Sequence, residues 1–161
     1  MIFNLWKEHN LRGYAFEYIA KVVLRRQQKN NFIFPTVLFD NIDEISKKYR
    51  FNYTDNLCTF IDLLRREWKR CDLIEFKCQD KKNRLVYKIN VYEVKTKIHS
   101  VKRDYFEICL SNHKFYQECN RLNVPTHIVS IIIFENWRFS FNIIPYEKVK
   151  KRIYTHYKKD R

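Results

Sequence analysis

The chain has 161 residues and contains a single glycine, Gly13. P-loops and dinucleotide-binding turns need several glycines, because their backbone amides must closely approach phosphate oxygens. The sequence therefore excludes the common nucleotide-binding folds that are built on such loops. It also excludes glycine-rich linkers, collagen and the Asn-Gly hairpin turn.

The five cysteines are odd in number and contain no Cys-x-x-Cys pair. A structural zinc site and the disulfide framework of a secreted protein both need a different spacing or count. We therefore interpret the cysteines as small buried apolar residues in a reducing compartment. They are Cys58, Cys71, Cys78, Cys109 and Cys119.

The sequence has no apolar run close to the roughly 18 residues of a membrane span. Its first residues also lack the basic and apolar regions of a secretory signal peptide. We therefore expect a soluble, cytoplasmic protein with no membrane partner. The length favours a single domain over residues 1–161, large enough to fold without a disulfide or a metal ion.

Acidic residues are scarce, since 18 Asp and Glu stand against 32 Lys and Arg, which gives a net charge of +14. Such a surplus favours an anionic partner, with nucleic acid as the first candidate. A lysine-rich solvated exterior explains the same charge without any partner. The aromatic content of 17% and the hydrophobic content of 45% indicate a folded domain rather than a basic tail.

The spacing of apolar residues predicts a mixed α/β domain with helices on a central sheet. An amphipathic helix is predicted over residues 12–29, and residues 31–70 are expected to contain two short helices. The remaining prediction is a strand over 72–78, a strand over 84–97, an extended piece over 105–110, a helix over 111–122, and strands over 126–134 and 137–143.

The second predicted strand carries the most informative pattern, Glu93-Val-Lys95. Alternate side chains on a strand share a face, so Glu93, Lys95 and Lys97 point to the same side. Asp72 opens the partner strand, where hairpin pairing is expected to bring it near Glu93. Two carboxylates beside an ammonium can bind Mg²⁺ and position a water molecule. The alternative is an ordinary ion pair on an exposed strand face.

Two further features bear on this candidate site. Glu75-Phe-Lys77 repeats the Glu-x-Lys pattern, but the acid upstream of it lies in a predicted helix, so we do not interpret it as a site. Gly13 and Glu17 are four residues apart and share one face of the first helix. We predict that the missing side chain at Gly13 lets this helix approach the sheet and brings Glu17 towards the carboxylates. The alternative is that Gly13 starts the helix and Glu17 is exposed.

These motifs, in this order, resemble those of PD-(D/E)XK nucleases, and more specifically those of archaeal Holliday-junction resolvases and related nucleases of archaeal viruses. Gly13-Tyr-Ala-Phe-Glu17 is similar to the helix motif of the family. Cys71-Asp72-Leu-Ile is similar to the "PD" segment, with cysteine in place of proline, and Val91-Tyr-Glu93-Val-Lys95 to the (D/E)XK strand. The resemblance leaves residues 31–70 as a helical insertion.

The resemblance implies a restriction-endonuclease-like core, in which a mixed β-sheet is flanked by helices. It implies that Asp72, Glu93 and the carbonyl of Val94 hold Mg²⁺ or Mn²⁺, and that Glu17 holds a second metal ion or a metal-bound water. It also implies that Lys95 assists the attacking water. The implied reaction is the hydrolysis of DNA phosphodiesters, which leaves 5′-phosphate and 3′-hydroxyl ends. Holliday junctions and other branched DNA are among the expected substrates, and a homodimer is the expected form.

Basic residues flank this candidate site and are expected to contact DNA phosphates. The alternative for each of them is a solvated charged face. For His113 there are two interpretations, a polar side chain that faces the site and a surface histidine, and we favour the second. The basic C-terminal segment, 146–161, is either a DNA-contacting arm or a solvated terminus, and its tyrosine spacing suggests a short helix. The expected DNA contacts are Arg65, Arg66, Lys69, Arg70, Lys97, Lys102 and Arg103.

Two other functions compete with the nuclease interpretation. The chain can be a DNA-binding module that keeps the nuclease fold without catalysis, although the presence of Asp72, Glu93 and Lys95 argues against this. It can also be a structural protein that packages DNA or coats a virion. That last interpretation depends on charge alone.

Overall fold

The computed structural model describes residues 9–27, 31–79, 82–99, 104–134, 136 and 138–155. The expected DNA contacts Lys102 and Arg103 lie outside these residues, as does the C-terminal segment from residue 156 onwards. None of the described helices combines the length and the apolar character needed to cross a membrane.

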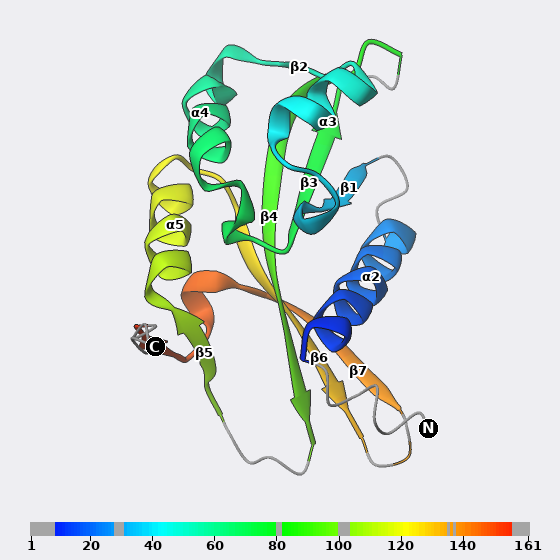
Figure 1. Ribbon diagram of the computed structural model, residues 1–161, viewed down its shortest axis with the longest axis vertical. Coiled ribbons are helices and arrows are strands. Elements are labelled where there is room, and N and C mark those ends of the chain that lie inside the picture. The colour runs from blue at the N-terminus through cyan, green and yellow to red at the C-terminus, as the bar shows by residue number, and fades with distance from the viewer. Residues whose placement is uncertain are drawn as a thin grey trace, which may run out of the picture.

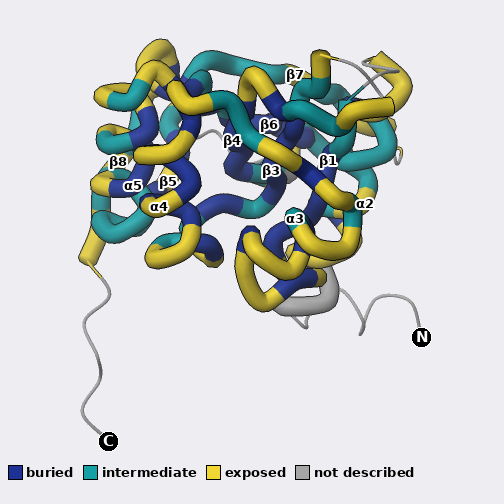
Figure 2. Tube along the Cα trace, turned by 90° about the horizontal axis from the view of Figure 1, so that it is seen from above, coloured by how far each residue is buried: buried dark blue, intermediate teal, exposed yellow. Residues whose placement is uncertain are grey.

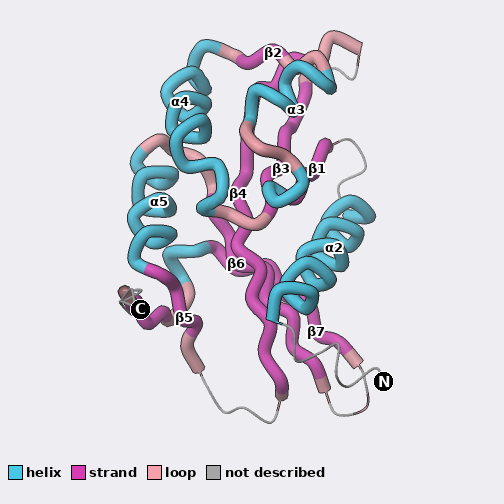
Figure 3. Tube along the Cα trace, in the orientation of Figure 1, coloured by secondary structure: helices cyan, strands magenta, loops and turns pink. Residues whose placement is uncertain are grey.

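A mixed β-sheet forms the centre of the molecule, with the strand order β1-β3-β4-β6-β7 and with β2 paired to β4 (Figures 1 and 3). β3 and β4 pair antiparallel, β4 and β6 parallel, and β6 and β7 antiparallel. The strands are β1 (Phe32–Pro35), β2 (Asn52–Tyr53), β3 (Leu73–Cys78), β4 (Leu85–Ile98), β6 (Thr126–Ile133) and β7 (Phe139–Pro145).

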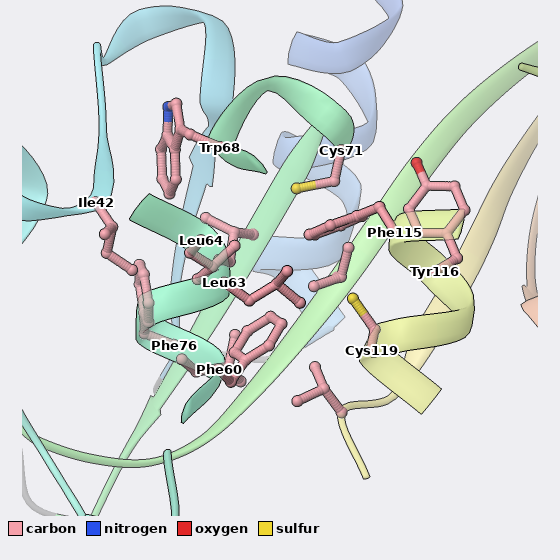
Figure 4. Packing of buried hydrophobic residues seen from close by; sticks show 14 of the residues in the cluster. Ile42, Phe60, Leu63, Leu64, Trp68, Cys71, Phe76, Phe115, Tyr116 and Cys119 are labelled. Carbon is pink, nitrogen blue, oxygen red and sulfur yellow. The ribbon is translucent and has the colours of Figure 1, made fainter. Parts of the chain in front are cut away.

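Three helices cover one face of the sheet, namely α3 (Ile42–Tyr49), α4 (Cys58–Glu67) and α5 (Leu110–Arg121). Their apolar side chains join Phe76 and Val91 of the sheet in the larger hydrophobic core. Figure 4 shows side chains of α4 and α5 meeting in this core. The arrangement confirms the predicted α/β class, a mixed sheet flanked by helices.

Helix α2 (His9–Gln27) packs on the opposite face of the sheet. Its side chains Phe16, Ala20 and Leu24 are buried against a second apolar cluster that includes Tyr92 and Val129. These three residues follow the spacing of an amphipathic helix, as the sequence predicts.

Residues 31–70 form part of the main folding unit. They provide β1, which pairs antiparallel with β3, as well as α3 and α4. The indole N–H of Trp68 donates to the carbonyls of Thr36 and Phe39, each at 2.9 Å. These bonds tie the end of α4 to the chain after β1. The sequence prediction missed β1, because four residues that end in proline are too short to show a strand period.

A second, two-stranded parallel sheet joins β5 (Phe106–Cys109) to β8 (Lys151–Tyr154). The short helix suggested for the C-terminal segment is therefore wrong at Lys151–Tyr154. Burial there alternates, with Lys151 and Ile153 half-buried and Arg152 and Tyr154 exposed. This period of two is that of a strand.

Gly13 does not have the role expected from the sequence. It is exposed, and a Cβ built on it would meet no described heavy atom within 4 Å. Its φ is not positive either. Ala20, fully buried against the sheet, is instead the small residue at the contact. The prediction that the missing side chain of Gly13 permits the approach of α2 is therefore wrong.

Replacing Gly13 with alanine is expected to stabilise the protein by about 0.5–1 kcal/mol, because glycine inside a helix loses more backbone entropy on folding. Urea unfolding of Gly13→Ala measures this change. Ala15→Gly, at an exposed position of the same helix, is the matched control with the opposite sign. A loss of stability in Gly13→Ala would show that α2 does need the missing side chain.

Candidate active site

Strand β4 extends beyond the end of its partner β3, which leaves part of one strand edge open. The pairing between them ends where Leu73 lies opposite Tyr92, whereas β4 continues along β6 as far as Ile98. Figure 1 shows this lower half of β4 running on beside β6. In the described part of the chain, no strand pairs with this edge of β4 beyond Tyr92.

Asp72 occupies the start of this open edge. Its N–H donates to the Tyr92 carbonyl at 3.1 Å, and its Oδ2 accepts from the Val94 N–H at 2.7 Å. The carboxylate therefore accepts the hydrogen bond that a backbone carbonyl would accept if a paired strand continued along this edge of β4. These bonds place Asp72 beside Glu93, as expected from the hairpin.

The Val94 carbonyl points to the same open edge. The N–H and C=O of one strand residue point to the same edge of the strand, and those of the next residue point to the opposite edge. The Val91 N–H donates to Pro125 and the His99 N–H to Ile133, which puts the odd-numbered residues of β4 on the β6 side. The carbonyl of Val94 therefore faces the other side, together with the N–H that binds Asp72.

Glu93 lies on the face of β4 that is covered by α5, and it is only 4% exposed. Its Oε1 lies 2.8 Å from Nζ of Lys95, as expected for alternate residues of one strand. Its Oε2 accepts a hydrogen bond from the hydroxyl of Tyr116, which is also 2.9 Å from the carbonyl of Arg70. Both carboxylate oxygens are thus held in place.

The sequence interpretation missed Tyr116. It directly follows Phe115 in α5, and both residues are buried in the structure. A buried tyrosine hydroxyl needs a hydrogen-bond partner, which is the signal that could have pointed to an acidic residue. That the partner is Glu93 depends on long-range packing.

Glu17 reaches the site from α2, on the other face of the sheet. Burial and the charge of Glu93 raise the pKa of Glu17 to about 7. The charge of Glu17 in turn contributes to raising the pKa of Asp72. Three carboxylates therefore lie within electrostatic reach of one another. Among the residues that the structure describes, no three or more His, Cys, Asp or Glu side chains are grouped so that they could hold a metal ion.

The carboxylates at this edge outnumber the ammonium group of Lys95 that lies beside them. Burial and then the charge of Glu93 raise the pKa of Asp72 well above its usual range, although the Val94 hydrogen bond opposes this. Burial alone would lower the pKa of Lys95, but the charge and hydrogen bond of Glu93 outweigh it and raise the pKa. Lys95 is therefore an ammonium at neutral pH and not a base.

Two of the arginines expected to contact DNA are engaged within the protein. Arg65 pairs with Asp43 at 3.1 Å and with Asp62 at 2.7 Å, on the surface shared by α3 and α4. Arg70 pairs with Glu67 at 2.8 Å. It also donates to the hydroxyl of Ser111 at 3.0 Å, which links the end of α4 to α5.

The other basic residues are placed differently. Arg66 and Lys69 are exposed just before Asp72 in the chain. Lys97 lies on the same strand as Lys95, with its ammonium 4.0 Å from the ring centroid of Phe106. Among the described residues, Arg66 and Lys69 form no ion pair, unlike the equally exposed Arg65.

His113 lies outside the carboxylate cluster. Its Nδ1 is 2.8 Å from the hydroxyl of Tyr146, and both residues line a neighbouring cavity of about 510 Å³. Tyr116 also lines this cavity, which extends along α5 past Gln117 and Asn120. His113 is half-buried in this pair, whereas the sequence interpretation favoured a surface histidine.

The second Glu-x-Lys pattern belongs to a buried network. Glu75 is fully buried and accepts hydrogen bonds from Asn31 at 2.5 Å, Asn90 at 2.6 Å and the Tyr92 hydroxyl at 2.7 Å. These neutral donors satisfy its carboxylate on the face of the sheet that α2 covers. Glu75 therefore connects β1, β3 and β4.

No protein-family model, curated protein or solved structure matches this chain. Conclusions about function therefore rest on the geometry of the site and on its motifs.

Glu17→Gln is expected to change how stability depends on pH. The pKa of Glu17 is 4.5 as its ordinary value and about 7 in the folded protein, so folding favours the protonated form. The stability contributed by that proton is lost as the pH rises from 4.5 towards 7 and beyond. The variant should therefore gain thermal stability over the wild type above pH 7 and gain little below pH 4.5.

Glu118→Gln is the control, because its effect on stability should change with pH in the opposite direction. The hydrogen bond from Arg121 lowers the pKa of this exposed residue, so its stabilising effect appears as the pH rises. A pH-independent difference between Glu17→Gln and the wild type would contradict the placement of Glu17 beside the other carboxylates.

Tyr116→Phe removes only the hydroxyl that binds Glu93. We expect it to lower the free energy of unfolding by about 1–3 kcal/mol, because a buried carboxylate oxygen loses its donor. Denaturant unfolding of the variant measures this loss. Tyr87→Phe, at a site that is 45% exposed, should change stability by less than about 0.5 kcal/mol. Equal stability of Tyr116→Phe and the wild type would contradict the hydrogen bond.

Proposed function

We propose that this chain is a metal-dependent DNA endonuclease of the PD-(D/E)XK type, with a restriction-endonuclease-like core. One observation carries the proposal, namely that Asp72, Glu93 and Lys95 meet at the open edge of β4 while Glu17 approaches from α2. The motifs that resemble this family, far apart in the sequence, are the ones whose acidic side chains interact. An acidic cluster in a chain of net charge +14 favours a cation at this place.

The oxygen atoms at this edge suit Mg²⁺ or Mn²⁺, which take carboxylates and carbonyls as ligands and keep several waters. The carboxylates of Asp72 and Glu93 and the carbonyl of Val94 would hold the ion. It would supply Lewis-acid stabilisation of phosphate charge and a more acidic water. The raised pKa of Asp72 agrees with this, because the charge of Glu93 contributes to it and a cation would offset that charge.

The remaining two side chains have distinct parts in the proposed hydrolysis. Lys95 keeps its proton, so its ammonium can orient the attacking water and offset the charge that develops on the phosphate oxygens. For Glu17 we keep the role that the resemblance implies, the holding of a second metal ion or of a metal-bound water, which its electrostatic interaction with Glu93 and Asp72 supports.

DNA is the proposed substrate because of the positive surplus and the resemblance to nucleases. The exposed Arg66 and Lys69, close to Asp72 in the chain, would bind phosphates without reading sequence. The resemblance to resolvases adds branched DNA as a substrate and a homodimer as the active form.

Asp72→Asn and Glu93→Gln are expected to reduce cleavage by more than about 100-fold, because each removes a carboxylate that would hold the cation on which the reaction depends. Cleavage of labelled four-way, flapped and linear DNA is measured with Mg²⁺ or Mn²⁺, and with EDTA as the blank. Binding of the same DNA in EDTA should persist in both variants.

Asp55→Asn changes an exposed acid outside the site and should cleave like the wild type. Full metal-dependent activity in both site variants would disprove the assignment. A wild-type protein that binds these DNAs and cleaves none of them would favour the catalytically silent DNA-binding module.

A further inference from the structure

The outer face of α2 carries a stripe of aromatic and basic side chains that the proposed chemistry does not use. Tyr14, Tyr18, Lys21 and Arg25 follow the spacing i, i+4, i+7 and i+11, which places them along one side of the helix. Tyr14 is 49% exposed and Tyr18 is 63% exposed. Figure 2 shows exposed residues recurring along α2, whose opposite side is buried.

The stripe begins at the candidate active site. Glu17 directly precedes Tyr18 and is three residues after Tyr14, so the two rings flank it on the helix surface. Glu17 itself interacts electrostatically with Glu93 and Asp72. A strand lying along the stripe would therefore end next to the carboxylates.

At the basic end of the stripe, two cations lie four residues apart on one side of the helix. Burial and the charge of Arg25, one helical turn further on, lower the pKa of Lys21. Within the described ranges, neither one forms an ion pair with an acidic side chain. Neighbouring like charges on a helix are unfavourable by themselves, but they favour contact with a polyanion.

We propose that this stripe binds an unpaired stretch of nucleic acid strand beside the scissile phosphate. Bases stack on Tyr14 and Tyr18, and phosphates lie against Lys21 and Arg25. Exposed rings next to cations are the arrangement that proteins use to bind single strands, because every base has a face that can stack. Bases inside a continuous duplex are already stacked and cannot do so.

This inference rests on the proposed nuclease function and specifies its substrate class. The preferred substrate is DNA with unpaired bases at a branch, such as a flap or a splayed arm, rather than continuous duplex. A second copy of this chain, seated on the stripe through a two-fold contact, is the competing occupant that the experiment distinguishes.

The test measures binding of a fluorescent oligothymidine strand and of a fully paired hairpin in EDTA. Replacing both Tyr14 and Tyr18 with alanine should weaken single-strand binding by about tenfold for each ring. Hairpin binding should change by less than about threefold. Leucine at both positions should bind like alanine, whereas phenylalanine should bind like the wild type, because only phenylalanine keeps the ring.

Tyr87→Ala is the matched control, since Tyr87 is 45% exposed on β4 and lies outside the stripe. Replacing Lys21 and Arg25 with alanine should reduce the salt dependence of single-strand binding by about 0.7 for each cation on a logarithmic plot. The same replacement at the exposed Lys47 and Lys114 is the control for net charge.

Three results would overturn the inference: wild-type single-strand affinity in the alanine variant, equal losses for single strand and hairpin, or a dimer that the leucine variant keeps and the alanine variant loses. The last result would assign the stripe to a second copy.

Because EDTA prevents metal-dependent cleavage, binding is tested apart from the nuclease proposal. If the wild type cleaves with Mg²⁺ while the ring variants bind normally, the stripe alone is disproved. If the ring variants lose single-strand binding and the wild type never cleaves, the nuclease proposal is disproved, and with it the assignment of the bound strand as a substrate.

Discussion

The contact between Asp72 and β4 determines the geometry of the candidate site. Two hydrogen bonds, to the Tyr92 carbonyl and from the Val94 N–H, hold Asp72 where β3 ends and β4 continues. The same register turns the Val94 carbonyl to the open edge and points Glu93 towards α5. A shift of one residue would send Glu93 to the α2 face and separate it from Tyr116.

The sheet gathers three carboxylates at this edge, although such burial opposes folding. Burial and mutual repulsion raise the pKa of Asp72 and of Glu17, while Lys95 and Tyr116 hold Glu93. Proteins concentrate such unfavourable arrangements at functional sites, because chemistry needs them there. A bound cation would offset the charge that the protein itself leaves unbalanced. On α2 the like charges are positive. The neighbouring cations Lys21 and Arg25 repel each other, and a bound polyanion would offset their charge.

The strands that carry the site could be predicted because their signal is local. A period of two places Glu93 and Lys95 on one face whatever the rest of the fold does. β1 and β8 were missed because each has only four residues and becomes a strand through its partner. Helical spacing related Gly13 to Glu17, but it could not reveal that Gly13 faces open space. The hydrogen bond between Tyr116 and Glu93 depends on packing between α5 and β4, which leaves no local pattern.

Anomalous X-ray diffraction from crystals soaked in Mn²⁺ tests the central claim most directly. The account predicts a peak at the open edge of β4, bounded by the carboxylates of Asp72 and Glu93 and by the carbonyl of Val94. The peak should disappear in crystals of Glu93→Gln, while the fold stays the same. Mn²⁺ bound only elsewhere, or a peak at this edge that persists without the Glu93 carboxylate, would contradict the account.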